Sequence, residues 1–122
     1  MSNHKLLPLG SVVYLEEGTI PVMIVLRQPV LNVQDKFYYL DYAAINQIVG
    51  LEPEKITYFN HEDISNIIFE GYVSEQEERI QQALAEWVQK HPEIPKGSVE
   101  SIHDLLEEWF KFNRNSVLGF KT

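Results

Sequence analysis

The chain has 122 residues, 44% of them apolar, a formal net charge of −8 and no cysteine. Its length predicts one folded domain, and the lack of cysteine excludes disulfide bonds and thiolate chemistry. The acidic balance argues against nucleic acid and anionic membrane surfaces as partners, because both attract basic proteins, and it favours a basic protein partner.

The first 70 residues alternate between β-branched or aromatic runs and turn residues, which predicts antiparallel strands. Five strands are expected over residues 11–15, 20–27, 37–44, 55–59 and 66–70. Strands that are neighbours in sequence are expected to pair. Residues 28–36 are predicted as a loop and residues 45–53 as a turn. The expected fold is α+β, with a small five-stranded antiparallel sheet or a curled barrel.

Asn60 is predicted to cap a single helical turn, with the Asp63 carboxylate reaching back to backbone amides. His61, Glu62 and Asp63 form the one cluster of a histidine with carboxylates. A metal site would need further ligands, and the spacing of the other histidines suggests none, so we expect His61 to face solvent. Asp41, which lies among tyrosines, is expected to accept hydrogen bonds. The alternative for both is a catalytic or small-ligand site.

A helix is predicted to follow Ser74, because Ser74 and Glu77 have the spacing of a capping box. Its apolar residues recur at helical spacing: Ile80, Ala83, Leu84, Trp87 and Val88. Pro92 ends this helix, and a second helix is expected from Ser98 or Ser101. Its apolar stripe is Ile102, Leu105, Leu106, Trp109 and Phe110. The two helices are predicted to form a C-terminal antiparallel hairpin.

Two parts are therefore predicted: an antiparallel β domain over residues 1–73, and two amphipathic helices with a tail over residues 74–122. The second part is expected to pack on the sheet as one domain. Between residues 74 and 109 the chain has nine acidic and three basic side chains, which suggests docking of a cationic partner or simply a solvated helix face.

Aromatic residues often dominate protein interfaces, so we take five of them as candidates for partner binding. They are Tyr39, Tyr42, Trp87, Trp109 and Phe110. The alternative is that they fill the core. If the helical stripes are exposed in a monomer, a homodimer becomes possible. The N-terminus shows no signal peptide, and no apolar run approaches the ~20 residues that cross a bilayer, so we expect a cytoplasmic protein without membrane insertion.

Five strings in the chain carry a family resemblance. They are Leu6-Leu7-Pro8-Leu9-Gly10-Ser11-Val12-Val13, Met23-Ile24-Val25-Leu26-Arg27, Tyr39-Leu40-Asp41-Tyr42-Ala43, Tyr58-Phe59-Asn60-His61-Glu62-Asp63-Ile64 and Ile68-Phe69-Glu70-Gly71-Tyr72. In this order they resemble the small bacterial proteins grouped as domain of unknown function 4176, over roughly residues 6–78. The chain departs from that pattern at residues 44–53, where Gly50 and Glu52-Pro53 replace a tyrosine-proline-glutamate-glycine-like turn.

The resemblance implies a Gram-positive (Bacillota) source and a gene neighbourhood of type VII secretion and LXG toxins. It also implies a cytoplasmic chaperone or adaptor with no enzymatic activity. We therefore expect a non-enzymatic accessory protein that binds a type VII-secreted, LXG-type toxin before export, with no cofactor and no catalytic or metal-binding residues. The alternatives are an immunity protein that neutralises a toxin domain, or a small-ligand binder or enzyme.

Overall fold

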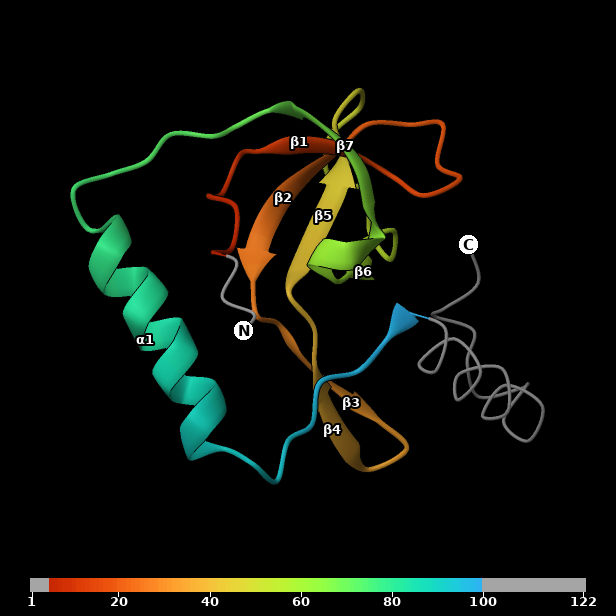
Figure 1. Cartoon of the computed structure of the whole chain (residues 1–122). Coiled ribbons are helices and arrows are strands. Elements are labelled where there is room, and N and C mark those ends of the chain that lie inside the picture. The colour runs from red at the N-terminus through yellow and green to blue at the C-terminus, as the bar shows by residue number, and fades with distance from the viewer. Residues whose placement is uncertain (1–4, 100–122) are drawn as a thin grey trace.

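The computed structural model describes residues 5–99, which form an antiparallel sheet, a separate hairpin and one helix (Figure 1). The strands are β1 (Val12–Leu15), β2 (Val22–Arg27), β3 (Val30–Val33), β4 (Lys36–Tyr39), β5 (Tyr42–Asn46), β6 (Thr57–Phe59) and β7 (Ile64–Phe69). A short 3-10 turn over His61–Asp63 precedes β7, and helix α1 covers Glu77–Lys90. The α+β class and the predicted turn after Asn60 are confirmed.

Five strands form one open sheet in the order β6-β5-β2-β1-β7, with every pair antiparallel. In the described residues β6 and β7 are its two edges, so the curled-barrel alternative is wrong. The expected pairing of sequence neighbours holds for β1 with β2, for β2 with β5 (within the predicted strands 20–27 and 37–44) and for β5 with β6. It is wrong for β7, which crosses to β1 and pairs Leu15 with Ile64. The 3-10 turn redirects the chain there, and the Glu16 amide donates a 2.9 Å hydrogen bond to the Asp63 carbonyl.

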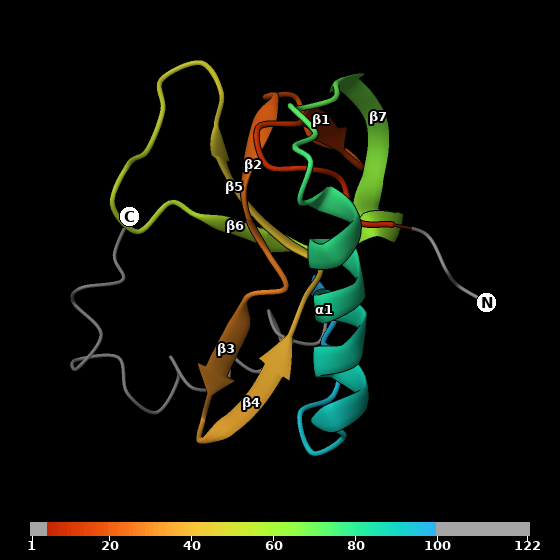
Figure 2. The same cartoon turned by 90° about the vertical axis from the view of Figure 1, so that its left-hand side faces the viewer.

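The prediction of a loop over residues 28–36 is wrong, because residues 30–33 form β3, which pairs with β4 as a hairpin that extends beyond the sheet (Figure 2). Gln34 and Asp35 both have positive φ, as the tight turn between antiparallel strands requires. The predicted strand over residues 37–44 is in fact two strands, interrupted at Leu40 and Asp41. The Asp41 carbonyl accepts a 2.8 Å hydrogen bond from the Gln28 amide at this bend.

The core lies where the sheet meets the N-terminal segment. Its buried members are Leu6, Leu7, Val13, Val22, Ile24, Tyr42, Ala44 and Phe59. Leu84 of α1 is partly buried against them, so the helix packs on the same core as the sheet. A second, smaller buried cluster joins Val33, beside the turn of the β3–β4 hairpin, to Leu40 at its base.

Helix α1 confirms the first predicted helix, but its start differs from the predicted capping box. The Ser74 hydroxyl accepts a 3.1 Å hydrogen bond from the Gln76 amide. The Glu77 carboxylate instead accepts hydrogen bonds of 2.8 and 3.3 Å from the Arg27 guanidinium on β2. These bonds hold the pKa of Glu77 below its ordinary value. Glu77 therefore ties the helix to the sheet.

The inward face of α1 is also rotated from the predicted apolar stripe. Ile80 and Ala83 are exposed, whereas Gln81 faces the body of the protein. The Gln81 side-chain amide bonds both backbone groups of Leu6, accepting from its N–H at 3.1 Å and donating to its carbonyl at 2.7 Å. Gln81, which bonds the N-terminal segment, thus faces inward where the apolar stripe predicts Ile80.

The predicted second helix, with Trp109 and Phe110, lies outside the described residues. In the part that the structure describes, α1 is the one regular α-helix, and it is neither long nor apolar enough to cross a membrane.

Candidate functional site

A hydrogen-bond network joins the predicted histidine–carboxylate cluster to Asp41. The His61 amide donates to the Asp41 carboxylate at 2.9 Å. The Lys96 ammonium lies 3.2 Å from the same carboxylate oxygen and 3.8 Å from the exposed Glu62 carboxylate. Because Asp41 is buried, the lysine and the backbone amide compensate for the loss of water around its charge. Asp41 therefore has the hydrogen-bonding role expected of it.

Asn60 holds three segments of the chain together. Its side-chain oxygen accepts a 3.0 Å hydrogen bond from the Asp41 amide, and its side-chain nitrogen donates to the Gly97 carbonyl at 2.8 Å. Its own amide donates to the Asp63 carboxylate at 2.9 Å, which confirms the Asp63 half of the predicted cap. Only 2% of Asn60 is exposed, and its two side-chain bonds, to Asp41 and Gly97, are shielded from water. The residue is a buried tertiary link as well as the start of a turn.

Tyr42 lies at the centre of the core and is fully buried. Its hydroxyl accepts a 2.9 Å hydrogen bond from the Leu7 amide and lies 2.8 Å from Nδ1 of His61. The expectation that His61 faces solvent is therefore wrong, since its ring is half-buried and hydrogen-bonded to the core. The proposal of Tyr42 as a partner-binding residue also needs correction, because no partner can reach this ring in the folded protein.

Burial raises the pKa of the Tyr42 hydroxyl to about 12, although its hydrogen bond from Leu7 opposes the shift. As the pH rises above the ordinary value of 10.0, this proton dissociates from the unfolded chain before it dissociates from the folded one. The contribution of Tyr42 to the free energy of unfolding therefore falls progressively up to pH 12. We expect Tyr42→Phe to cost about 1–2 kcal/mol at pH 7, through the lost hydrogen bonds. Between pH 9 and pH 12 the free energy of unfolding of wild type should fall by about 2 kcal/mol relative to Tyr42→Phe, so the gap should close or reverse.

Urea unfolding of both proteins across this pH range measures the gap. Tyr72→Phe removes a hydroxyl from a ring that is 82% exposed, and it should leave the free energy of unfolding at pH 7 unchanged. A gap between wild type and Tyr42→Phe that stays constant with pH would show that the Tyr42 hydroxyl does not titrate in this way.

Tyr39 and Trp87 meet between β4 and α1. Their rings are edge-to-face with centroids 6.1 Å apart, and Trp87 also stacks on His91 at 4.3 Å. Both residues are half-buried, and burial raises the pKa of the Tyr39 hydroxyl. The backbone of Tyr39 pairs with residues 95–97, which follow the helix. These two aromatics thus pack the helix and its following segment onto the hairpin, and their binding of a partner stays a prediction.

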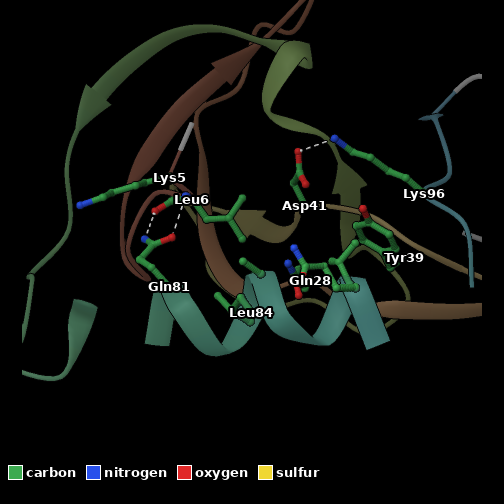
Figure 3. A pocket seen from close by; sticks show the side chains of 11 residues that line it. Lys5, Leu6, Gln28, Tyr39, Asp41, Gln81, Leu84 and Lys96 are labelled. Atoms are coloured by element: carbon green, nitrogen blue, oxygen red, sulfur yellow. Dashed lines mark hydrogen bonds and ion pairs between the residues drawn. The ribbon is translucent and has the colours of Figure 1, made fainter. Parts of the chain in front are cut away.

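A pocket of about 490 Å³ lies between α1 and the bend at residues 40–41 (Figure 3). Leu6, Leu84 and Val88 supply its apolar lining, and Gln28 and Asp41 are among its polar lining residues. The pocket does not bring together the predicted catalytic set. His61 instead lines a separate hollow beside β7, and in residues 5–99 no three histidine, aspartate or glutamate side chains are placed to hold a metal ion.

Large apolar side chains are exposed along β7 and the segment after it. The residues are Ile67, Ile68, Phe69, Tyr72 and Val73, each between 46% and 82% exposed. We refer to the outer side of β7, residues 64–69, as the β7 edge. The sequence predicts the strand but not its exposure, because nothing in the local pattern says that β7 ends the sheet.

The family model that describes a domain of unknown function (DUF4176) matches residues 6–80. The chain belongs to the DUF4176 family. No curated protein and no solved structure matches the chain. The DUF4176 segment covers the sheet, the hairpin and the first turn of α1, so Trp87, Lys96 and Gly97 lie beyond it.

The most distinctive strings of this DUF4176 domain contribute to the Asn60 hydrogen-bond network and to the place where the chain at Gly71 crosses the N-terminal segment. Asn60, His61 and Asp63 form the turn and its hydrogen bonds, as described above. Gly71 is buried where the chain passes the N-terminal segment, and its amide donates to the Ser11 hydroxyl at 2.9 Å. The strings therefore specify how the N-terminal segment, β5 and the turn before β7 are joined.

Proposed function

We propose that this DUF4176 protein is a non-enzymatic accessory protein in the cytoplasm that binds a type VII-secreted, LXG-type toxin before export. The observation that carries the binding role is the run of exposed apolar side chains on β7 and at residues 72–73, because exposed apolar surface that gathers on a folded protein commonly marks an interaction site. The resemblance to proteins associated with such toxins supports the choice of partner.

The acidic character of the chain supports the same proposal. A net charge of −8 favours encounter with a basic polypeptide through long-range attraction, and it adds solubility to a protein that exposes apolar side chains. The Asn60 network holds in place the turn that leads into the exposed strand.

Co-expression of the tagged full chain with an LXG-type toxin gene from the same genome, followed by affinity capture and size-exclusion chromatography, tests the proposal. We expect the toxin to co-elute with the chain, and toxin fragments to show which region is bound. Absence of any complex would overturn the proposal. Binding confined to the catalytic C-terminal part of the toxin, with cells surviving toxin expression only when this chain is present, would instead establish an immunity protein.

A further inference from the structure

The outer backbone of β7 is open to another strand. In residues 5–99 β7 pairs with β1 on one side, and no strand pairs with its other side. Figure 2 shows β7 at the margin of the sheet, away from the β3–β4 hairpin. An edge strand presents a row of backbone N–H and C=O groups that an extended peptide can pair with.

The β7 edge lacks charged side chains and proline, two of the features by which natural proteins prevent such pairing, although its ladder with β1 has two register shifts. It has six residues, Ile64–Phe69, with no proline, lysine or other charged side chain among them. The opposite edge, β6, has only three residues, Thr57–Phe59, and offers much less backbone. Length and composition therefore make β7 the better of the two edges for strand addition.

Acidic side chains lie at both ends of the β7 edge. Glu16 and Glu17 are exposed near its start, where the Glu16 amide bonds the Asp63 carbonyl. Glu70 is exposed directly after its end. Between residues 56 and 78 the sequence has no lysine or arginine. The edge is thus an apolar strip with negative charge at each end.

This charge pattern disfavours a second copy of the chain as the occupant. An antiparallel β7–β7 pair centred on Asn66 and Ile67 would bring Asp63 of one copy opposite Glu70 of the other, at both ends. A parallel pair in register would align each acid with itself. Like charges directly across a ladder destabilise it, whereas opposite charges stabilise it.

We infer that the β7 edge binds an extended segment of a protein partner, about six residues long, with apolar side chains in its centre and lysine or arginine at both ends. Backbone hydrogen bonds supply the pairing. Ile67, Ile68 and Phe69 contact the apolar centre of the added strand, and the acids at the two ends of β7 attract its basic flanks. This inference deepens the proposed function. It rests on that function for one premise, that the partner is a polypeptide.

Two synthetic decapeptides serve as probes of the full chain. Each has a centre of alternating threonine and valine, and they differ only in carrying two lysines or two glutamates at each end. By fluorescence anisotropy at low salt we expect the lysine-flanked peptide to bind at least tenfold more tightly than the glutamate-flanked peptide. The lysine-flanked peptide should also slow hydrogen exchange in residues 64–69 and leave residues 57–59 unchanged.

Ile67→Lys places a charge on the edge strand and should weaken binding of the lysine-flanked peptide at least tenfold. Ile48→Lys is the matched control, because Ile48 is also an exposed isoleucine, at 68% against 46% for Ile67, but lies in the turn between β5 and β6. It should leave the dissociation constant within twofold of wild type. Circular dichroism confirms that both variants are folded, and the exchange measurement on wild type tests the site without any substitution.

The inference would be overturned if the two peptides bound equally or if neither bound. It would also be overturned if the peptide slowed hydrogen exchange outside residues 64–69 instead, or if exchange along the outer side of β7 were already slow in the free chain. In the last case light scattering would show whether a second copy occupies it. Toxin capture that survives Ile67→Lys, together with no peptide binding, would reject this surface while leaving the proposed function intact. Failure of toxin capture by wild type would reject the proposed function irrespective of the peptide result.

Discussion

Replacing Asn60 with alanine is expected to lower the free energy of unfolding by about 3 kcal/mol, because two buried backbone groups each lose a hydrogen-bond partner at a cost of roughly 1–3 kcal/mol. The Asp41 amide loses the side-chain oxygen that it bonds at 3.0 Å, and the Gly97 carbonyl loses the nitrogen that it bonds at 2.8 Å. Urea unfolding followed by circular dichroism measures the change.

Asn66→Ala is the matched control, since Asn66 is exposed on β7 and its replacement should change stability by about 0.5 kcal/mol or less. Asn60→Asp adds a second test, because it keeps an acceptor for the Asp41 amide but removes the donor to Gly97. It also puts a charge beside the Asp63 carboxylate, so we expect it to be destabilising as well. If Asn60→Ala is no more destabilising than Asn66→Ala, the network does not hold these segments together.

The sequence predicts those parts of the fold that depend on neighbouring residues. The β1–β2 hairpin, the turn after Asn60 and the first helix are all formed by local signals: turn glycine, a carboxylate three residues after the cap, and apolar residues at helical spacing. The pairing of β7 with β1 joins residues about 50 positions apart, and no local pattern distinguishes it from pairing with β6. The open edge of β7 follows from this pairing, so the candidate binding surface is also invisible in the sequence.

The aromatic candidates for partner binding also divide into what local sequence predicts and what only the tertiary structure shows. Tyr39 and Tyr42 stand in one nearly continuous aromatic run, and strand periodicity would assign their side chains to opposite faces. The bend at Leu40 and Asp41 breaks that period, and it leaves Tyr42 fully buried while Tyr39 meets α1. Similarly, the apolar stripe of α1 cannot predict that Gln81 faces inward, because its partner is the backbone of Leu6, 75 residues away.

Gly71→Ala is expected to be at least as destabilising as Asn60→Ala, at about 3 kcal/mol or more, because overpacking at a site without freedom to relax exceeds the ordinary 1–3 kcal/mol. A Cβ atom here would overlap the carbonyl oxygen of Leu9 and lie 2.9 Å from the amide nitrogen of Ser11. Both are backbone atoms, so no side chain can rotate away. The strain would fall on the crossing where Ser11 also bonds the Pro8 carbonyl at 2.8 Å.

Gly50→Ala separates this steric cost from the conformational preference of glycine. Gly50 has a φ of +88° but no atom within 4 Å of an added Cβ, so we expect a loss of about 1 kcal/mol from backbone strain alone. Thermal and urea unfolding of the two variants give the comparison. Equal losses would mean that the N-terminal segment moves aside to admit a methyl group at residue 71. A much larger loss for Gly71→Ala would establish that the glycine in this family string is required because two backbone segments pass each other with no room for a side chain.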